Sequence, residues 1–505
     1  MLPPVIGRRD FLKTTGLTVG ALAMGTTYWR QALAQSPTNP GPGPYGPLGA
    51  PDAFGVALPP GFTARVVAAS GTPVGTTGYV WPLFPDGKAT FAQPDGGFVL
   101  TVNSEVPGVG GASSISFDRD GNITGARRIL SGTSTNCGGG STPWGTWLSC
   151  EEIDGGQVWE CDPLGRTAAV PRPAMGRFTH EAAAVDPKGQ RLYMTEDEGN
   201  SGFYRFTPAR YPDLSEGILE IATPGSGGRI AWIQVPDPTA ATGETRTQVP
   251  TSMKFKRGEG LWFDTGVVYF STTSDDRIWA YDVATEVLEL LYDGVALGDA
   301  APLRDPDQLN AHPTSGDLFV CEDADDLQIV MITQEREVAP FAQLSGPLHQ
   351  AGTEFAGTTF DPEGKRLFFS SQRGGLGGLT FEVTGPFRSV LPRRPLTAAG
   401  QAAVGACQLV LRAKPAARLA TVRKSGLAVG VDAAAGVLAV RLKIDGQTIL
   451  STRRTVKAGR VRLKLRPRAN ARKVIVRSAR GRRVRGTLEL RQGGQTVTRP
   501  IVLTR

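Results

Sequence analysis

The sequence predicts an all-β protein, a β-propeller of five or six blades followed by a small C-terminal β-sandwich. Three observations predict this class. An apolar strand that follows a Gly or Asp turn recurs five times between residues 96 and 370, as in propeller blades with insertions. The same region has almost no segment with the apolar period of an amphipathic helix. After residue 387 the composition changes, and a second set of alternating strands begins.

The recurring strand is the clearest repeat in the chain. Each copy begins at a Gly/Asp turn, runs through apolar and aromatic residues, and usually ends at a polar or acidic residue. The copies lie at 96–103, 189–195, 267–272, 316–321 and 364–370. An all-β sandwich is the alternative fold, but it does not explain why an acid so often follows the strand. We therefore expect a propeller over residues 54–387.

The first 34 residues have the pattern of an export signal. Arg8 and Arg9 precede a weakly apolar run, and Ala32-Leu33-Ala34 has the small-x-small pattern of a cleavage site. Paired arginines in this context resemble a twin-arginine signal. The apolar run is too short to span a bilayer, which disfavours an uncleaved anchor. We expect residues 1–34 to direct export through the twin-arginine translocase to the periplasm, cell envelope or exterior, with a Pro/Gly linker at 35–53.

Charge divides the chain after residue 400. Residues 401–505 contain 25 Lys and Arg but 3 Asp and Glu, whereas residues 35–400 contain 26 Lys and Arg against 43 Asp and Glu. A Pro/Ala/Gly/Arg linker is expected at 388–412. Strands with a period of two follow it, as at 438–444. We expect a basic immunoglobulin-like β-sandwich at 413–505.

The basic face of this predicted sandwich has two interpretations. It can bind an anionic cell-envelope polymer or the anionic membrane surface by charge, or it can keep the protein soluble without a partner. The segment lacks the interleaved aromatic residues of a single-stranded nucleic-acid platform, so no specific nucleic acid is expected. We expect the protein to be a monomer.

One stretch, residues 136–152, combines a thiol, a glycine run and two adjacent acids. Three glycines follow Cys137, and they predict a loop whose backbone can approach a ligand closely. The aromatic segment after them predicts a strand that ends at Glu151 and Glu152. A thiol, open backbone amides and carboxylates would then lie together at one end of a strand.

The cysteine and histidine counts limit the chemistry. Five cysteines are an odd number, so they cannot all pair within the chain. A disulfide between Cys150 and Cys161 is possible across a hairpin, and the sequence leaves that pairing open. The chain has three histidines, which disfavours a zinc site built from several of them.

Acids recur at the ends of the repeated strands. The innermost strands of a propeller line its central channel, so acids at the same end of successive strands converge on the axis. Clustered carboxylates repel one another unless cations lie between them, and carboxylate oxygens suit hard cations. The sequence therefore predicts a metal site in the channel. Its candidate ligands are Glu105, Glu151, Glu152, Glu181, Glu196, Asp197, Glu259, Glu322, Asp323 and Glu354.

Four motifs together resemble the PhoX family of bacterial alkaline phosphatases. The most specific is the stretch at 136–152, from Asn-Cys-Gly-Gly-Gly to Cys-Glu-Glu. The others are Gly-Arg-Phe-Thr-His-Glu-Ala at 176–182, Phe-Tyr-Arg-Phe at 203–206 and Glu-Phe-Ala-Gly at 354–357. The resemblance covers residues 54–387. It implies an exported β-propeller that hydrolyses phosphate monoesters at a mixed iron and calcium cluster in its channel.

The resemblance also implies roles for individual residues. Cys137 would be a thiolate ligand of Fe³⁺ at the catalytic cluster. Glu181, Glu259 and Glu354 would be bridging or terminal carboxylates there. The acids that would complete the Fe³⁺ and Ca²⁺ shells are Glu105, Glu152 and Asp197.

The chemistry expected at such a site is metal-assisted phosphoryl transfer. Basic residues beside the acidic motifs are candidates to bind the substrate phosphate. These are Arg177, Lys256, Arg257 and Arg373. Two other functions stay open. A calcium-dependent propeller lactonase or other hydrolase would also place acids on the axis but would have no use for Cys137. A non-catalytic metal-binding propeller, anchored to the cell surface by the basic domain, would tolerate the loss of Cys137.

Overall fold

The structure is a computed structural model in which most of the chain is described. The described residues are 38–388 without 227–228, 324–325 and 350–351, together with a set of strands between 410 and 504. The chain divides into two compact units, Met1–Val390 and Leu391–Arg505. The expected signal at 1–34 and most of the linker expected at 388–412 lie outside the described residues.

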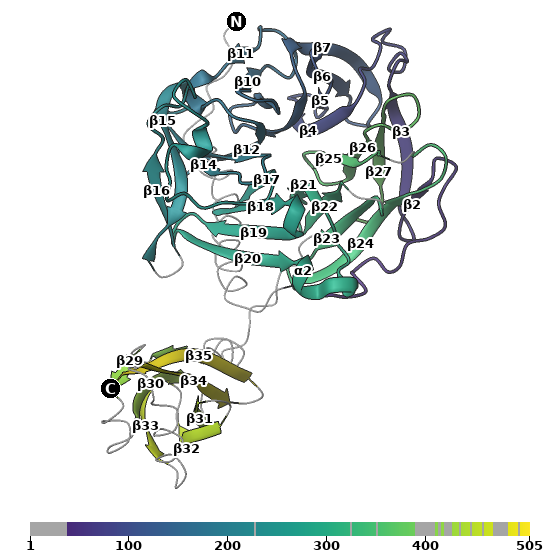
Figure 1. The fold of residues 1–505 in the computed structure, drawn as a ribbon. Helices are drawn as coiled ribbons and strands as arrows, with labels where there is room; N and C mark the ends of the chain where they lie inside the picture. Colours follow the sequence, from purple (N-terminus) through teal and green to yellow (C-terminus); the bar gives the residue numbers. More distant parts are fainter. Residues whose placement is uncertain are drawn as a thin grey trace, which may run out of the picture. The chain divides into compact units, whose positions relative to one another are not determined.

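Six antiparallel sheets surround a central channel in the first unit, which is therefore a six-bladed β-propeller (Figure 1). In each blade consecutive strands pair, and the first strand lies nearest the axis. The innermost strands contact one another in a closed ring. The first blade consists of β4 (Pro85–Ala92), β5 (Phe98–Ser104), β6 (Gly110–Phe117) and β7 (Ile123–Thr133). The second consists of β8 (Asn136–Ser141), β9 (Trp147–Glu151), β10 (Val158–Cys161) and β11 (Val170–Pro171). The third consists of β12 (His180–Asp186), β13 (Arg191–Glu196), β14 (Phe203–Arg210), β15 (Asp213–Pro224) and β16 (Ile230–Gln234).

The other three blades repeat this arrangement. Their strands are β17 (Gly258–Asp264), β18 (Val267–Thr272), β19 (Arg277–Asp282) and β20 (Val287–Asp293); β21 (Pro306–Ala311), β22 (Leu318–Glu322), β23 (Gln328–Ile332) and β24 (Glu337–Leu344); and β25 (Phe355–Phe360), β26 (Arg366–Ser371) and β27 (Leu379–Thr384).

The sixth blade takes its outermost strand from the beginning of the unit. β3 (Thr63–Ala69) pairs antiparallel with β27, with Thr63 opposite Thr384. Two short strands, β1 (Asn39–Pro40) and β2 (Val56–Ala57), pair with β24 of the fifth blade. The two ends of the propeller sequence therefore join in one sheet and close the ring.

The repeated strands of the sequence are the second strands of the blades. The five predicted copies correspond to β5, β13, β18, β22 and β26. The innermost strands come before the Gly/Asp turns. Because the two strands are antiparallel, the end of each second strand lies beside the start of the innermost strand, at the same mouth of the channel. Acids at these ends therefore still reach the channel.

Large apolar side chains fill the space between neighbouring blades. Phe203 of β14 stacks on Phe270 of β18 with ring centroids 4.6 Å apart, and both rings are buried. They belong to one cluster that spans the third and fourth blades. Fully burying one such side chain contributes about 1.5–3 kcal/mol. This packing fixes neighbouring blades relative to each other, so the ends of their inner strands form a rigid frame.

Helical structure in the described residues is limited to single turns. They are α2 (Gly294–Leu297), η1 (Pro173–Met175), η3 (Thr245–Thr247), η4 (Thr273–Asp275) and η5 (Gly298–Ala300). No helix among the described residues has the length and apolar character needed to cross a bilayer.

The second unit is described as eight strands in one continuous pairing order, β28-β30-β33-β32-β31-β34-β35-β29. β32 and β33 share two residue pairs, Leu450 with Pro467 and Ser451 with Arg466. The two separately packed sheets of an immunoglobulin-like sandwich stay a prediction. The strands are β28 (Val410–Arg412), β29 (Ala416–Arg418), β30 (Leu427–Ala433), β31 (Gly436–Ile444), β32 (Gln447–Val456), β33 (Gly459–Pro467), β34 (Arg483–Gln492) and β35 (Gln495–Thr504).

Candidate metal centre in the propeller channel

A β-bulge near the start of five innermost strands places one side chain at the channel axis. In β4 the pairing with β5 shifts between Pro85 and Lys88. The same shift occurs at the same place in β8, β12, β17 and β21. A bulge bends the strand and re-aims its side chains. The residues in the second position of these five strands are Asp86, Cys137, Glu181, Glu259 and Asp307.

A second set of side chains comes from the ends of the second strands. Each residue of this set donates its backbone N–H to a carbonyl oxygen just before the innermost strand of its blade, as Glu105 does to Phe84 at 2.9 Å. The shared hydrogen bond fixes this position in every blade. The six residues are Glu105, Glu152, Asp197, Thr273, Asp323 and Gln372.

Members of both sets meet in a cavity of about 240 Å³, which we call the acid cup. Its lining residues are Asp86, Glu105, Cys137, Glu152, Arg257, Glu259, Asp307, Asp323, Glu354 and Arg373. Three groups of side chains, made of cup residues and the adjoining Glu181, each have ligand atoms that all lie within 4.8 Å of one another. The groups are Cys137, Glu152 and Glu181; Asp86, Glu105 and Glu354; and Glu181, Glu259 and Asp307.

The sixth blade departs from the other five. Its pairing shift comes later in the strand, between Ala356 and Thr359, and neither Ala356 nor Gly357 carries an acid. The acid of this blade is Glu354, which directly precedes β25 and accepts a hydrogen bond from Arg373 at 2.9 Å.

A buried cation takes the place of the missing acid. The ammonium of Lys88 donates to the carbonyl oxygens of Asp86 at 2.5 Å and Ala356 at 3.0 Å. A Cβ added to Gly357 would lie 2.4 Å from this ammonium nitrogen. Burial lowers the pKa of Lys88 to about 8, although the negative charge of Asp86 opposes that shift.

Three second strands end in two acids, and the two acids differ in role. Glu151 accepts hydrogen bonds from the Ser134 backbone at 3.1 Å and from the Trp159 indole at 2.9 Å. Glu196 and Glu322 likewise accept backbone N–H groups of their own blades. The following acid points the other way, because successive residues of a strand face opposite sides. Glu151, predicted as a metal ligand, therefore does not line the acid cup.

The glycine run after Cys137 is the middle of strand β8, so the prediction of a loop there is wrong. A Cβ on Gly138 would lie 2.4 Å from the carbonyl oxygen of Glu181, and one on Gly140 would lie 1.7 Å from that of Ala183. The glycines therefore allow β8 to lie against β12 near the narrow axis of the propeller. The backbone of the glycine run therefore approaches a neighbouring strand closely, where the sequence predicts close approach to a ligand.

Burial raises the pKa values of the acids in the cup, and repulsion between them adds to the effect. The pKa of Glu105 is raised to about 7, that of Glu259 to about 8 and that of Glu152 to about 10. Burial also raises the pKa of Asp307 and of Glu354 well above the usual range. Without cations, the folded cup would therefore retain protons at neutral pH.

Glu181 does not line the cup, but it adjoins lining residues in two of the ligand groups and shows that the site fits bound metal ions. This residue is fully buried, and neither of its carboxylate oxygens has a hydrogen-bond partner. Burial, and then the charge of Glu259, raises its pKa well above the usual range. The buried Cys137 thiol lies 3.6 Å from Asp86 Oδ2. A buried carboxylate requires a partner, and oxygen donors with one sulfur suit hard cations beside a metal that accepts thiolate.

Two of the four predicted phosphate-binding residues line the cup. Arg257 donates to Asp197 from Nε and Nη2, each at 2.9 Å, and its Nη2 lies 3.0 Å from Glu259. Arg373 is held by Glu354. The side chains of the two arginines are 37% and 39% exposed. Both guanidinium groups therefore lie at the rim, bound to acids below and open to solvent above.

The other two predicted phosphate-binding residues do not line the cup. Arg177 donates to the carbonyl oxygen of Gly155 at 3.2 Å, and Lys256 is exposed. Asp197, predicted to complete a metal shell, is bound by Arg257 and likewise does not line the cavity.

The four cysteines in the described residues are all free, and Cys407 lies outside them. Cys150 lies opposite Val158, and Cys161 lies opposite Trp147. The disulfide that the sequence leaves open between Cys150 and Cys161 is therefore absent.

The three histidines are bound to the protein away from the metal-ligand groups. His180 Nε2 lies 3.0 Å from the carbonyl oxygen of Gly176, and burial lowers the pKa of this imidazole to about 3. His312 and His349 also have protein partners, and burial lowers the pKa of each.

Sequence reasoning missed two residues of the cup, Asp86 and Asp307. Each follows a proline at the start of an innermost strand, Pro85 in β4 and Pro306 in β21. The signal that could identify these two acids is their position in the sequence relative to the strand that follows. Asp86, Asp307 and Cys137 lie 12, 11 and 10 residues before the second strand of their blades.

Comparison with solved structures finds weak likenesses. One is to a protein of unknown function from Bacteroides thetaiotaomicron, with 10% identity and a TM-score of 0.43 over 64% of this chain and 76% of that one. Another is to a gluconolactonase from Xanthomonas campestris, with 16% identity and a TM-score of 0.40 over 70% of this chain and 99% of that one. These likenesses are too weak to bear on function. No curated protein matches the sequence.

Comparison with family models is decisive. The model for the alkaline phosphatase PhoX matches residues 109–159 and 154–375, which is more than half of the 505 residues. The matched segment contains Cys137, the glycine run of β8, and the acids of the second to sixth blades. The chain therefore belongs to the PhoX alkaline phosphatase family.

Proposed function

We propose that the protein is an exported, metal-dependent phosphatase that hydrolyses phosphate monoesters, with Fe³⁺ and Ca²⁺ bound in the acid cup. The observation that carries the proposal is the buried Glu181 carboxylate, whose two oxygens have no hydrogen-bond partner. It belongs to two of the three ligand groups, one of which also contains Cys137. Membership of an alkaline phosphatase family supplies the reaction.

The three ligand groups would hold the metal ions. The group with Cys137 would take iron, because the thiolate is a soft ligand among hard ones. The groups built from carboxylates alone suit calcium or ferric iron. Bound ions would withdraw charge from the phosphate oxygens and lower the pKa of a water that attacks phosphorus.

Arg257 and Arg373 would bind and orient the phosphate at the rim of the cup. A guanidinium group binds phosphate oxygens through a planar pair of donors. Contacts with Asp197 and Glu354 hold the two side chains in place. A phosphate held between them would meet the ligand groups below without a large loss of side-chain freedom. The acids of the cup, neutralised by cations, would no longer repel it.

Export and anchoring complete the proposal. The twin arginines at positions 8 and 9 would direct the folded protein through the twin-arginine translocase. The strongly basic C-terminal unit would bind an anionic polymer of the cell envelope by charge. Deletion of residues 391–505 tests the binding to the envelope. The shortened protein should no longer be retained at the cell surface, and its phosphatase turnover should be unchanged.

The test of the proposed function is elemental analysis of protein matured through its export route, together with turnover of p-nitrophenyl phosphate. Wild type is expected to contain iron and calcium and to be active. Cys137→Ser is expected to lose iron and at least 100-fold in kcat, as a removed metal ligand does. Cys150→Ser is the matched control, because this buried thiol is not in the cup. Calcium alone, no turnover and an unaffected Cys137 variant would contradict the proposal.

A further inference from the structure

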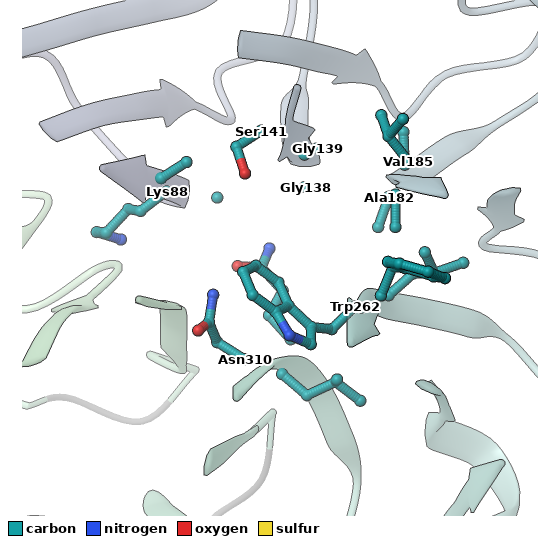
Figure 2. Close-up of a pocket in the computed structure, with 18 of the residues that line it drawn as sticks. Lys88, Gly138, Gly139, Ser141, Ala182, Val185, Trp262 and Asn310 are labelled. Carbon is teal, nitrogen blue, oxygen red and sulfur yellow. The ribbon is translucent and has the colours of Figure 1, made fainter. Parts of the chain in front are cut away.

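A second cavity lies farther along the same channel. Its volume is about 290 Å³, and it shares no lining residue with the acid cup. The innermost strands begin at the cup, and later residues of the same strands line this cavity. It is therefore a separate compartment of the channel, shown in Figure 2.

The walls of this cavity are unequal. The strands β4, β8 and β12 contribute mainly small residues to its lining. The small residues are Gly87, Ala89, Gly138, Gly139, Gly140, Ala182, Ala183 and Ala184. The other side carries the indole of Trp262 from β17 and the amide of Asn310 from β21. In Figure 2 the indole of Trp262 projects into the middle of the pocket, below the glycines of β8.

Trp262 lacks the partners that other tryptophans of the protein have. Five other indole N–H groups donate a hydrogen bond to a protein oxygen, and Trp81 packs against Tyr79. Within the described residues, the indole N–H of Trp262 has no hydrogen bond and its ring has no stacking or cation-π contact, although the residue packs against the apolar cluster of the fourth and fifth blades. Indole groups usually pair their N–H, so an indole that faces a cavity unpaired points to a ligand.

Two more polar groups face the cavity without a partner in the described part of the chain. The side-chain amide of Asn310 makes no hydrogen bond, although the residue is only 5% exposed. The hydroxyl of Ser141 makes none either. In Figure 2 the Asn310 side chain lies next to the indole of Trp262, and the Ser141 side chain lies across the pocket near the glycines of β8. An amide offers an acceptor and two donors, and a hydroxyl offers both. The cavity therefore presents a flat apolar face and a polar edge that has no protein partner in the described residues.

We propose that this cavity binds a small molecule with a flat heteroaromatic ring of the nucleobase type. One face of the ring would stack on the indole of Trp262. The polar edge of the ring would exchange hydrogen bonds with the Asn310 amide and the Ser141 hydroxyl. The small residues of β4, β8 and β12 leave room for the ring. Binding needs no phosphate group and no metal ion, so the proposal is independent of the phosphatase function.

The test is calorimetric titration of the full-length folded protein with adenosine and with uridine, which lack phosphate. Saturable binding of at least one nucleoside at one site per chain is expected. Trp262→Leu and Asn310→Leu are each expected to weaken it at least tenfold. Trp279→Leu is the matched control, because Trp279 lies in the same blade and donates to Thr272 outside the cavity. It should leave the affinity unchanged.

Three controls keep the result interpretable. Melting temperatures establish that each variant is folded, and Trp262→Phe, which retains a ring but no N–H, replaces Trp262→Leu if that variant does not fold. Inorganic phosphate should not compete with the nucleoside. Cys137→Ser should bind it as wild type does, even if phosphatase activity is lost. Absence of saturable binding for both nucleosides, or wild-type affinity in both cavity variants, would overturn the proposal.

Discussion

The ammonium nitrogen of Lys88 lies where a side chain at position 357 would begin, because a Cβ on Gly357 would be 2.4 Å from it. Lys88 belongs to the first blade and Gly357 to the sixth. Five blades contribute an acid or a thiol to the ring, and at the junction with the sixth the ring contains a buried cation. The acid cup is therefore partly neutralised by the protein itself.

Gly357 is expected to tolerate no side chain. Its φ is +65°, and an added Cβ would also lie 2.3 Å from the carbonyl oxygen of Asp86. Gly357→Ala should cost roughly 3 kcal/mol or more, from backbone strain and the clash together. Gly352→Ala is the control, since Gly352 also has a positive φ, +81°, but open space around it. That variant should cost about 1 kcal/mol. Urea unfolding measures both, and equal costs would contradict the contact.

Removal of the Lys88 charge is expected to destabilise the metal-free protein. Lys88→Met would leave the acids of the cup without their internal cation and two buried carbonyl oxygens without a donor. The melting temperature should fall by several degrees at pH 7, where Lys88 with its pKa of about 8 is charged, and by less at pH 5, where the acids are protonated. Lys365→Met, at an exposed ion pair with Glu363, should have little effect at either pH. A loss that is the same at both pH values would argue against a role in charge balance.

Stability of the metal-free propeller is expected to fall as the pH rises. Burial raises the pKa of Glu105 to about 7 and of Glu259 to about 8, from an ordinary value of 4.5. Between pH 4.5 and the folded pKa values, the folded state therefore binds more protons than the unfolded state. Its extra stability is present at low pH and is lost as the pH rises through the folded pKa values. The three histidines, with lowered pKa values, are neutral above pH 7 and do not contribute.

Thermal unfolding in chelator from pH 6.5 to 9 measures this effect, and added Ca²⁺ should reverse it. The cation binds the ionised carboxylates of the folded state and stabilises it by mass action. The increase in melting temperature on addition of Ca²⁺ should therefore be larger at pH 9 than at pH 6.5. A stability that is independent of pH in chelator would mean that the acids are not coupled in the cup.

Replacing the buried Glu181 or the buried Glu196 by glutamine is expected to change the stability of the protein in opposite directions. Glu181→Gln removes one of several repelling charges, so the metal-free protein should become more stable at pH 8 while cation binding is lost. Glu196→Gln removes the charge that pairs with Arg246 at 2.9 Å, and it should destabilise the protein by about 3 kcal/mol. Calorimetric titration with Ca²⁺ and thermal unfolding distinguish the two. If both variants destabilise the metal-free protein, Glu181 is stabilising like a paired buried acid, which would contradict its role as a metal ligand.

The sequence predicts the second strands of the blades well, because each is an apolar run bounded by a Gly/Asp turn, as at 316–321. It does not predict the innermost strands from periodicity. These strands lie against one another near a narrow axis, and they use glycine and polar residues, as at Cys137–Gly140, in place of alternating apolar ones. For that reason the sequence predicts a loop where β8 lies, and it does not single out Asp86 or Asp307.

The sequence also does not show which of two adjacent acids faces the channel. Glu151 and Glu152 look equivalent there, yet one binds the Trp159 indole and the other lines the cup. The difference depends on which residue of the pair faces the channel, and the register of the strand sets it. All four predicted phosphate-binding residues neighbour acidic motifs in the sequence, but only Arg257 and Arg373 line the cup. Arg177 donates to Gly155, and Lys256 is exposed.

The pairing of β3 with β27 sets the order of events during synthesis. Residues 63–69 leave the ribosome early and wait for residues 379–384 before the sixth sheet is complete. The ligand group of Asp86, Glu105 and Glu354 joins the first and sixth blades across the seam between their inner strands, β4 and β25. It cannot form in a nascent chain that ends before the sixth blade. A cation bound there would hold the seam shut, so cation capture would mark the moment at which the ring has closed.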